Sequence, residues 1–211
     1  MIVTVGNSKG GVGKSTTSLQ LALGLSLDGA RVWLVDGDRQ ETSVTAITIR
    51  TDSGRPPIAA SAYANGATLR TQVQAQRHAY DHIIIDAGGR DSSALRAALT
   101  VSDSVLIPFL PRSFDVWALH DIAELVEEAR AVHDLKPLAF MNAADPQGAD
   151  NRDAAAAIRD FSSIELLPYR LNRRKAFSNA SGAGLHVEEM KHRDTAACAE
   201  IERLKDAVFA L

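Results

Sequence analysis

The residues best suited to chemistry lie near the start of the chain, in the segment Lys9-Gly10-Gly11-Val12-Gly13-Lys14-Ser15-Thr16. Its three glycines lack the Cβ atoms that would keep backbone N–H groups away from phosphate oxygens. Lys14 adds a positive charge where terminal phosphates would lie, and Ser15 can ligate magnesium. The segment therefore predicts a nucleotide phosphate-binding loop, to which every residue from Lys9 to Thr16 contributes. The alternative is a glycine-rich turn that only joins a strand to a helix.

This loop departs from the usual P-loop pattern Gly-x-x-x-x-Gly-Lys-Ser/Thr, because Ser8 stands at the position of the first glycine. What remains is Lys-Gly-Gly-x-Gly-Lys-Ser/Thr, in which Lys9 is a second cation beside the same phosphates. The pattern resembles the deviant Walker A loop of the ParA/MinD family of ATPases. In that family the early lysine reaches the partner subunit's nucleotide. The resemblance implies catalytic roles for Lys9 and Lys14, ATP as the ligand, and an ATP-dependent homodimer.

Two acidic residues follow an apolar strand in Val32-Trp33-Leu34-Val35-Asp36-Gly37-Asp38-Arg39-Gln40. Ligands of open α/β sheets bind beyond the carboxyl ends of strands, so this segment is expected to face the phosphates. It is similar to the family's Asp-x-Asp-Pro-Gln motif, which implies that Asp36 supports the magnesium ion and that Asp38 positions the attacking water. The alternative is that both aspartates cap a turn or the next helix. Arg39 replaces the family's proline, and we expect it to face solvent.

Another apolar strand ends in an acidic residue, within Tyr80-Asp81-His82-Ile83-Ile84-Ile85-Asp86-Ala87-Gly88-Gly89. Asp86 matches the Walker B position and is predicted to hold magnesium directly or through water. The two glycines that follow leave the backbone free to move with the γ-phosphate, which predicts a switch segment. The predicted magnesium ligands are therefore Ser15, Asp36 and Asp86.

The adenine end of the site has weaker signals. Asn142 is expected to follow a strand, and its family position implies contact with the adenine edge, together with Pro168 in Leu167-Pro168-Tyr169. The alternative for Asn142 is turn chemistry, which is common for asparagine at a strand end.

Basic side chains gather between residues 169 and 193, although the whole chain has a net charge of −3. This segment has six basic and two acidic side chains, a net charge of +4 with histidines neutral. Such a local excess predicts non-specific, salt-sensitive DNA binding, which the family resemblance also implies. A solvated helix face is the alternative. The predicted DNA-binding residues are Arg170, Arg173, Arg174, Lys175, Lys191 and Arg193.

These residues require a scaffold of alternating strands and helices. Short apolar runs and longer helical patterns alternate, which indicates an α/β fold: a doubly wound, mostly parallel sheet with helices on both faces. The strands lack apolar–polar alternation, as expected when both faces are covered. We expect strands at Ile2–Val5, Arg31–Val35, His82–Ile85, Ser104–Pro108, Leu138–Met141 and Ile164–Leu167. The predicted helices are Lys14–Leu27, Phe114–Val132 and Thr195–Leu211, and Thr51–Pro57 is a predicted loop.

The composition is typical of one globular domain. With 211 residues, 45% of them hydrophobic and 23% charged, we expect a single P-loop ATPase domain over residues 1–211 with no N-terminal helix-turn-helix domain. Cys198 is the only cysteine, which excludes an intrachain disulfide and the iron–sulfur role of the nitrogenase iron protein. No apolar run approaches the ~20 residues of a membrane span, and acidic residues offset the basic ones in the last helix, so we expect no membrane partner.

We interpret the chain as resembling short, ParF-like partition ATPases of the ParA type. The resemblance implies that it binds ATP and Mg²⁺, dimerises around nucleotide and binds DNA without sequence preference. Hydrolysis to ADP and phosphate would be slow until a ParB-type centromere-binding protein stimulates it. The expected location is the cytoplasm, on the nucleoid in the ATP state. The alternatives are a positioning ATPase for a carboxysome, a chemoreceptor cluster, or a conjugation or secretion apparatus, and a nucleotide-dependent switch that hardly hydrolyses ATP.

Overall fold

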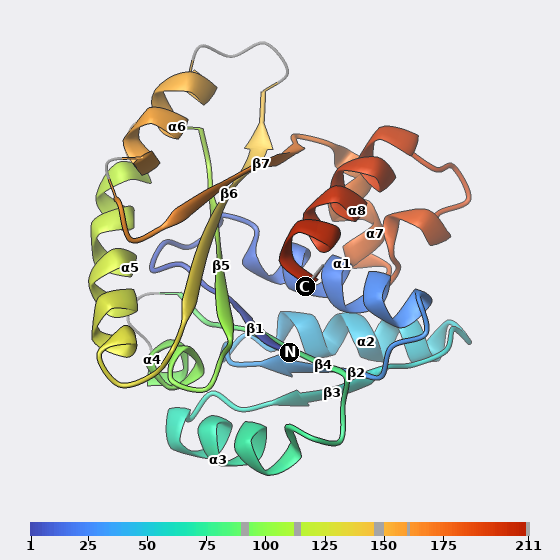
Figure 1. The fold of residues 1–211 in the computed structure, drawn as a ribbon. Coiled ribbons are helices and arrows are strands. Elements are labelled where there is room, and N and C mark those ends of the chain that lie inside the picture. The colour runs from blue at the N-terminus through green and yellow to red at the C-terminus, as the bar shows by residue number, and fades with distance from the viewer. Residues whose placement is uncertain (90–92, 112–114, 146–149, 160, 210–211) are drawn as a thin grey trace.

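A parallel sheet forms the centre of the molecule (Figure 1). The computed structural model describes residues 1–89, 93–111, 115–145, 150–159 and 161–209. In these residues the sheet has seven strands in the order β3-β2-β4-β1-β5-β6-β7, and all neighbouring pairs are parallel. The strands are β1 Ile2–Val5, β2 Val32–Asp36, β3 Ala59–Ala62, β4 His82–Asp86, β5 Ser104–Phe109, β6 Lys136–Ala144 and β7 Glu165–Asn172.

Helices cover both faces of this sheet, as the doubly wound prediction requires (Figure 1). The helices are α1 Lys14–Leu27, α2 Thr42–Asp52, α3 Gly66–Gln76, α4 Ser93–Leu99, α5 Asp115–Arg130, α6 Asp150–Arg159, α7 Lys175–Gly182, the 3₁₀ helix η1 Val187–Glu189, and α8 Thr195–Phe209. The helices α1, α2, α7 and α8 bury one face, while α3 to α6 bury the other. The predicted fold class is therefore confirmed.

Successive residues of the strands point into different cores, which explains why the strands show no apolar–polar alternation. In β1, Val3 packs beneath α1 and α8, whereas Ile2 packs with residues of α3 and α4. The neighbouring strand β4 repeats this arrangement, with Ile84 on the first side and Ile83 on the second. A strand buried on both faces needs apolar side chains at every position, so its hydrophobic run is continuous.

Most predicted elements are confirmed, with shifted ends. Helix α1 has the predicted bounds, but the predicted helix ends Phe114 and Leu211 lie outside the described residues. The loop predicted at Thr51–Pro57 is wrong at its start, because α2 continues to Asp52. Strand β3 was missed because its sequence, Ala-Ala-Ser-Ala, lacks the β-branched and aromatic residues that favour strands.

None of the helices in the described ranges combines the length and the apolar character needed to cross a bilayer.

Candidate nucleotide-binding site

The predicted phosphate loop lies at the carboxyl edge of the sheet, between the central strand β1 and helix α1. Strand register brings Val5 of β1, Asp36 of β2 and Asp86 of β4 to the same level. The Gly6 N–H then donates to the Leu106 carbonyl at 3.1 Å, so the chain is still hydrogen-bonded to β5 where it leaves the sheet and enters the loop. Residues distant in sequence thus converge around the start of α1, as the sequence predicted.

The loop needs glycine at two positions. Gly11 and Gly13 have φ values of +75° and +92°, a left-handed conformation that other residues rarely adopt. A Cβ atom on Gly13 would also lie only 2.1 Å from Asn142 Nδ2. That nitrogen donates to the Val12 carbonyl at 2.7 Å, so Asn142 fastens the loop from the neighbouring part of the sheet.

The two loop lysines are connected through the backbone. Lys14 is buried, and its Nζ donates to the Lys9 carbonyl at 2.8 Å. Burial lowers the pKa of Lys14 below its ordinary value, while the carboxylates of Asp86 and Asp38 act in the opposite direction. The Lys9 N–H donates to the Asn7 side chain at 3.0 Å, and Asn7 Nδ2 donates to the Pro108 carbonyl at 2.8 Å. Asn7 therefore anchors the loop to β5.

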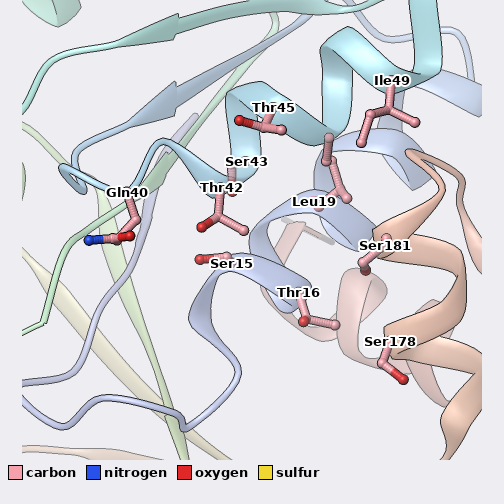
Figure 2. Close-up of a pocket in the computed structure, with 12 residues that line it drawn as sticks. Ser15, Thr16, Leu19, Gln40, Thr42, Ser43, Thr45, Ile49, Ser178 and Ser181 are labelled. Carbon is pink, nitrogen blue, oxygen red and sulfur yellow. The ribbon is translucent and has the colours of Figure 1, made fainter.

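Asp86 has the surroundings of a metal-binding carboxylate. It is buried, accepts a hydrogen bond from Ser43 Oγ at 2.6 Å, and is hydrogen-bonded to the Ser15 hydroxyl. Burial raises its pKa to about 6, because the charged form is poorly solvated. Figure 2 shows Ser15 on α1 opposite Thr42 and Ser43 at the start of α2. Sequence reasoning missed Ser43, whose only signal was a hydroxyl residue five positions after Asp38.

Asp36 has a different set of partners. Its carboxylate accepts hydrogen bonds from the backbone N–H groups of Asp38 at 3.0 Å, Ser43 at 2.8 Å and Val44 at 3.3 Å. It therefore caps the start of α2, which was the alternative role for this residue. Burial raises its pKa and these backbone bonds oppose that change. The support of magnesium by Asp36 stays a prediction. In this geometry Asp36 would act indirectly, by holding the start of α2 and thereby Ser43.

Gly88 and Gly89 connect the surroundings of Asp38 to the phosphate loop. Asp38 Oδ1 accepts a hydrogen bond from the Gln40 N–H at 3.0 Å. A Cβ atom on Gly88 would lie 3.3 Å from the Gly37 carbonyl and 3.5 Å from Asp38 Oδ2, and one on Gly89 would lie 3.3 Å from Lys14 Nζ. The glycine pair thus fits between the loop lysine and Asp38.

Two hollows border these residues. The first, of about 380 Å³, lies between α1, α2 and α7, and is lined by hydroxyl groups and by Leu19 and Ile49 (Figure 2). The second, of about 410 Å³, is lined by Gly37, Asp38, Arg39, Gln40, Ala64, Gly88, Gly89 and Ser93. Gln40 lines both hollows, so they lie next to each other at this residue.

The two residues predicted to contact adenine, Asn142 and Pro168, both lie within strands and have structural roles there. Asn142 lies inside β6, so the prediction that it follows a strand is wrong. Its Nδ2 holds the Val12 carbonyl, and its Oδ1 accepts from the Ala143 N–H at 2.9 Å, so an adenine contact must compete with these bonds. Pro168 lies in edge strand β7, near a register shift against β6, where a proline is tolerated. Contact of Asn142 and Pro168 with adenine stays a prediction.

The basic segment is partly used within the fold. Arg174 binds Glu200 through two nitrogens at 2.9 and 3.0 Å and pairs with Asp194 at 3.3 Å. Two carboxylates therefore already balance the charge of Arg174, and its contact with DNA stays a prediction. Arg173 is exposed and pairs with Asp145 at 3.4 Å. The remaining predicted DNA-binding residues, Arg170, Lys175, Lys191 and Arg193, are all exposed.

The donor set fits magnesium held together with phosphate. In the described part of the chain, no group of three or more His, Cys, Asp or Glu residues is arranged to bind a metal. Ser15 and Asp86 would supply two oxygen ligands, and Mg²⁺ typically completes its shell with substrate phosphates and water. A left-handed glycine loop between central strand and helix, with these two residues beside it, defines a P-loop nucleoside triphosphatase.

Comparison with known proteins agrees with this class. A family model described as an AAA domain matches residues 1–65. The chain is 28% identical over 212 residues to maintenance of carboxysome distribution protein A of Halothiobacillus neapolitanus, covering 98% of this chain and 95% of that protein. It is 25% identical over 215 residues to protein ParA of Rhizobium radiobacter, covering 100% and 95%.

A solved structure shows the same fold. The ATP complex of a McdA variant from Cyanothece superposes with a TM-score of 0.80 at 16% identity, covering 99% of this chain and 96% of that one. With its deviant phosphate loop, the chain is similar over its whole length to ATPases of the ParA type, and its fold is that of a P-loop ATPase.

Proposed function

We propose that this chain is a positioning ATPase that binds ATP and Mg²⁺, closes into a nucleotide-dependent homodimer, and opens again after hydrolysis. The observation that carries the proposal is the position of Lys14, whose Nζ binds the Lys9 carbonyl of the same loop and whose charge lies near Asp86 and Asp38. Lys14 is poised to exchange the Lys9 carbonyl for a phosphate oxygen. The Lys9 carbonyl would then lose its hydrogen bond to Lys14, so this part of the loop could change conformation when nucleotide binds.

The other residues have separate roles in this cycle. Ser15 and Asp86 hold Mg²⁺, which supplies positive charge against the phosphates when bound. Asp38 orients the attacking water, and the Gln40 N–H fixes the direction of its carboxylate. Lys9 reaches the nucleotide of the second copy in the dimer. Because the complete set exists only in the dimer, intrinsic turnover is slow.

The cargo we favour is a plasmid or chromosome, with non-specific DNA as the track and a ParB-type protein as the activating partner. Protein ParA of Rhizobium radiobacter supports this choice through its similarity over the whole chain. In this cycle the ATP dimer remains on the nucleoid within the cytoplasm, and hydrolysis releases it. The exposed basic residues Lys175, Lys191 and Arg193 are the proposed contacts with DNA.

A second cargo has support of its own. The carboxysome distribution protein of Halothiobacillus neapolitanus is 28% identical and matches 98% of this chain, so positioning of a protein compartment is an equally specific candidate. The ATP chemistry is the same for both cargoes. A switch that hardly hydrolyses ATP fits less well, because Asp38 and Lys9 are both present.

The test combines three measurements on the purified chain with ATP, ADP and no nucleotide. We expect dimers in light scattering only with ATP and Mg²⁺, phosphate release that depends on Mg²⁺, and DNA retention only in the ATP state. A chain that stays monomeric with ATP would contradict the dimer cycle. Deletion in the native host distinguishes the cargoes, since loss of plasmid or chromosome segregation supports partition and intact segregation with misplaced compartments supports the alternative.

A further inference from the structure

Arg39 lies at the terminal-phosphate side of the proposed site. It lines the 410 Å³ hollow together with Asp38, Gly88 and Gly89. Gly89 in turn lies against the phosphate loop, because a Cβ atom there would be 3.3 Å from Lys14 Nζ and 3.8 Å from the Gly10 nitrogen. The hollow therefore lies next to the end of the Lys14 side chain. In the chain, Arg39 directly follows Asp38, the residue proposed to orient water.

The side chain of Arg39 is available for a ligand. It is exposed, and within the described part of the chain it has neither a hydrogen bond nor an ion pair. Other arginines of this molecule are used differently: Arg50 and Arg174 both bind carboxylates of the fold. The sequence alone favoured a solvent-facing role for Arg39, but its place in the hollow gives its guanidinium a specific surrounding.

We propose that Arg39 is a further catalytic residue, whose guanidinium binds the terminal phosphoryl group of ATP from the side opposite Lys14. This inference rests on the proposed ATPase function and extends it. A guanidinium presents planar, paired donors that match phosphoryl oxygens.

The reaction step explains why a second cation is useful there. The water oxygen forms a bond to the γ-phosphorus while the bond to the bridging oxygen breaks, and the electron pair leaves with ADP. One water proton remains on the phosphate product and the other goes to solvent. Charge accumulates on the γ-phosphoryl oxygens, and an arginine at this point lowers the barrier in related phosphoryl transfers. Asp38, the neighbour of Arg39 in the chain, places a negative charge in the same hollow.

The test compares Arg39→Ala and Arg39→Lys with the wild-type chain under saturating ATP and Mg²⁺. We expect Arg39→Ala to lower kcat by about 10-fold to 1000-fold, with Arg39→Lys in between because it keeps charge without the planar donors. Binding of ATP should change by less than about 3-fold. Binding of ADP with aluminium fluoride, which imitates the phosphoryl group in transfer, should weaken in parallel with kcat.

The matched control is Arg77→Ala. Arg77 is also exposed but ends α3, whose length of about 16 Å separates it from the hollow. Unchanged kcat and unchanged aluminium fluoride binding in Arg39→Ala would overturn the proposal. So would a loss of kcat that comes only from a lost ATP-dependent dimer in light scattering. Partial recovery of Arg39→Ala by added guanidinium would support it. A wild-type chain without hydrolysis would instead contradict the proposed function.

Discussion

Asp38 is the residue whose chemistry can be separated most cleanly from its structural role. Its carboxylate accepts the Gln40 N–H at 3.0 Å, a bond that an asparagine oxygen can also accept. We expect both Asp38→Ala and Asp38→Asn to slow ATP hydrolysis by at least about 100-fold, because neither can orient and polarise water as a carboxylate does. Both variants should accumulate as ATP-bound dimers in size-exclusion chromatography with light scattering.

The comparison of the two variants decides the role of Asp38. A purely structural role predicts that Asp38→Asn hydrolyses ATP like the wild-type chain while Asp38→Ala does not. Asp52→Ala is a matched control, since Asp52 is an exposed aspartate at the far end of α2. Normal hydrolysis in both Asp38 variants would remove the residue from catalysis.

Lys9 carries the dimer hypothesis at the residue scale. The Lys9 backbone is fixed by Asn7 and by Lys14, so its side chain can be removed while the loop keeps its shape. We expect Lys9→Ala to bind ATP within a few-fold of the wild-type affinity but to remain monomeric, because the cross-subunit charge is lost. Lys136→Ala, at an exposed position in β6, is the control. An ATP-dependent Lys9→Ala dimer that hydrolyses normally would rule out this role.

The sequence predicted the phosphate loop well because its signal is local. Gly11, Gly13 and Lys14 act within a few residues of one another, and their spacing alone defines the backbone shape. Ser43 and Asn142 depend on how separate elements meet, since one bonds Asp86 from α2 and the other clamps the loop from β6. Such contacts have no local pattern, so only the structure reveals them.

Among the elements, α2 is held in place by a buried ion pair. Arg50 binds Glu189 of η1 through two nitrogens at 2.6 and 3.0 Å, and the exposed fractions of these side chains are 4% and 8%. We expect Arg50→Met to lower the free energy of unfolding by about 3 kcal/mol, because it leaves the buried Glu189 carboxylate with only the longer, 3.6 Å ion pair to the half-exposed Arg55. Urea unfolding followed by circular dichroism measures the change.

Two further variants test this interpretation of α2. The double variant Arg50→Met/Glu189→Met should recover much of the lost stability, since no unpaired buried charge remains and Arg55, which also contacts Glu189, is exposed to water. Arg31→Met removes a pair of similar geometry, Arg31–Asp81, but at the surface, with exposed fractions of 64% and 44%, and should change stability far less. Equal losses in Arg50→Met and Arg31→Met would show that burial of the pair is not the cause.

His186 makes the same region sensitive to acid. Its ring is buried, its Nδ1 accepts the Glu188 N–H at 3.3 Å, and burial lowers its pKa below the ordinary 6.5. The unfolded chain therefore binds a proton at a higher pH than the folded chain does. Stability is lost as pH falls below about 6.5, by at most about 1.4 kcal/mol per pH unit.

A difference between variants isolates the contribution of His186. We expect His186→Gln to lose less stability than the wild-type chain between pH 7.5 and pH 5.5, as measured by urea midpoints at both values. His192→Gln, at an exposed position, should follow the wild-type curve. Parallel curves for His186→Gln and the wild-type chain would mean that other groups cause the acid sensitivity.

At the element scale, the strands buried on both faces were the easiest to predict, because the continuous apolar runs of β1, β4 and β5 leave no alternative. Edge strand β3 contains only small residues, and its pairing with β2 is decided by the rest of the sheet. The register shift between β7 and β6 near Pro168 likewise arises from the pairing of the two strands, which the sequence does not specify.

For the whole molecule, the proposed DNA-binding surface lies at the starts of α7 and α8. The ion pair between Arg174 and Asp194 brings the starts of α7 and α8 together. Lys175 and Arg193, which follow and precede these two residues in the chain, are therefore carried to the same part of the surface. Arg174 itself holds the starts of α7 and α8 together, and its positive charge is balanced by Asp194 and Glu200. The variant Arg174→Ala would therefore test the stability of this region and not contact with DNA.

The prediction for DNA binding concerns its salt dependence. We expect Lys175→Ala/Arg193→Ala to weaken retention of DNA by the ATP state. The slope of log affinity against log salt concentration should become shallower by up to about 2, because each lost phosphate contact removes about 0.9. Fluorescence anisotropy with two unrelated duplexes measures both quantities. The same decrease on both duplexes is expected, since contacts with the phosphate backbone carry no sequence information.

Arg31→Ala/Lys136→Ala is the matched control, because it removes two exposed positive charges from other parts of the molecule. The net charge of both double variants is the same, so any long-range electrostatic effect should be equal in the two. A shallower slope only in Lys175→Ala/Arg193→Ala locates the DNA surface at the starts of α7 and α8. Equal slopes in both variants would place the DNA-binding surface elsewhere, while ATP binding should stay unchanged throughout.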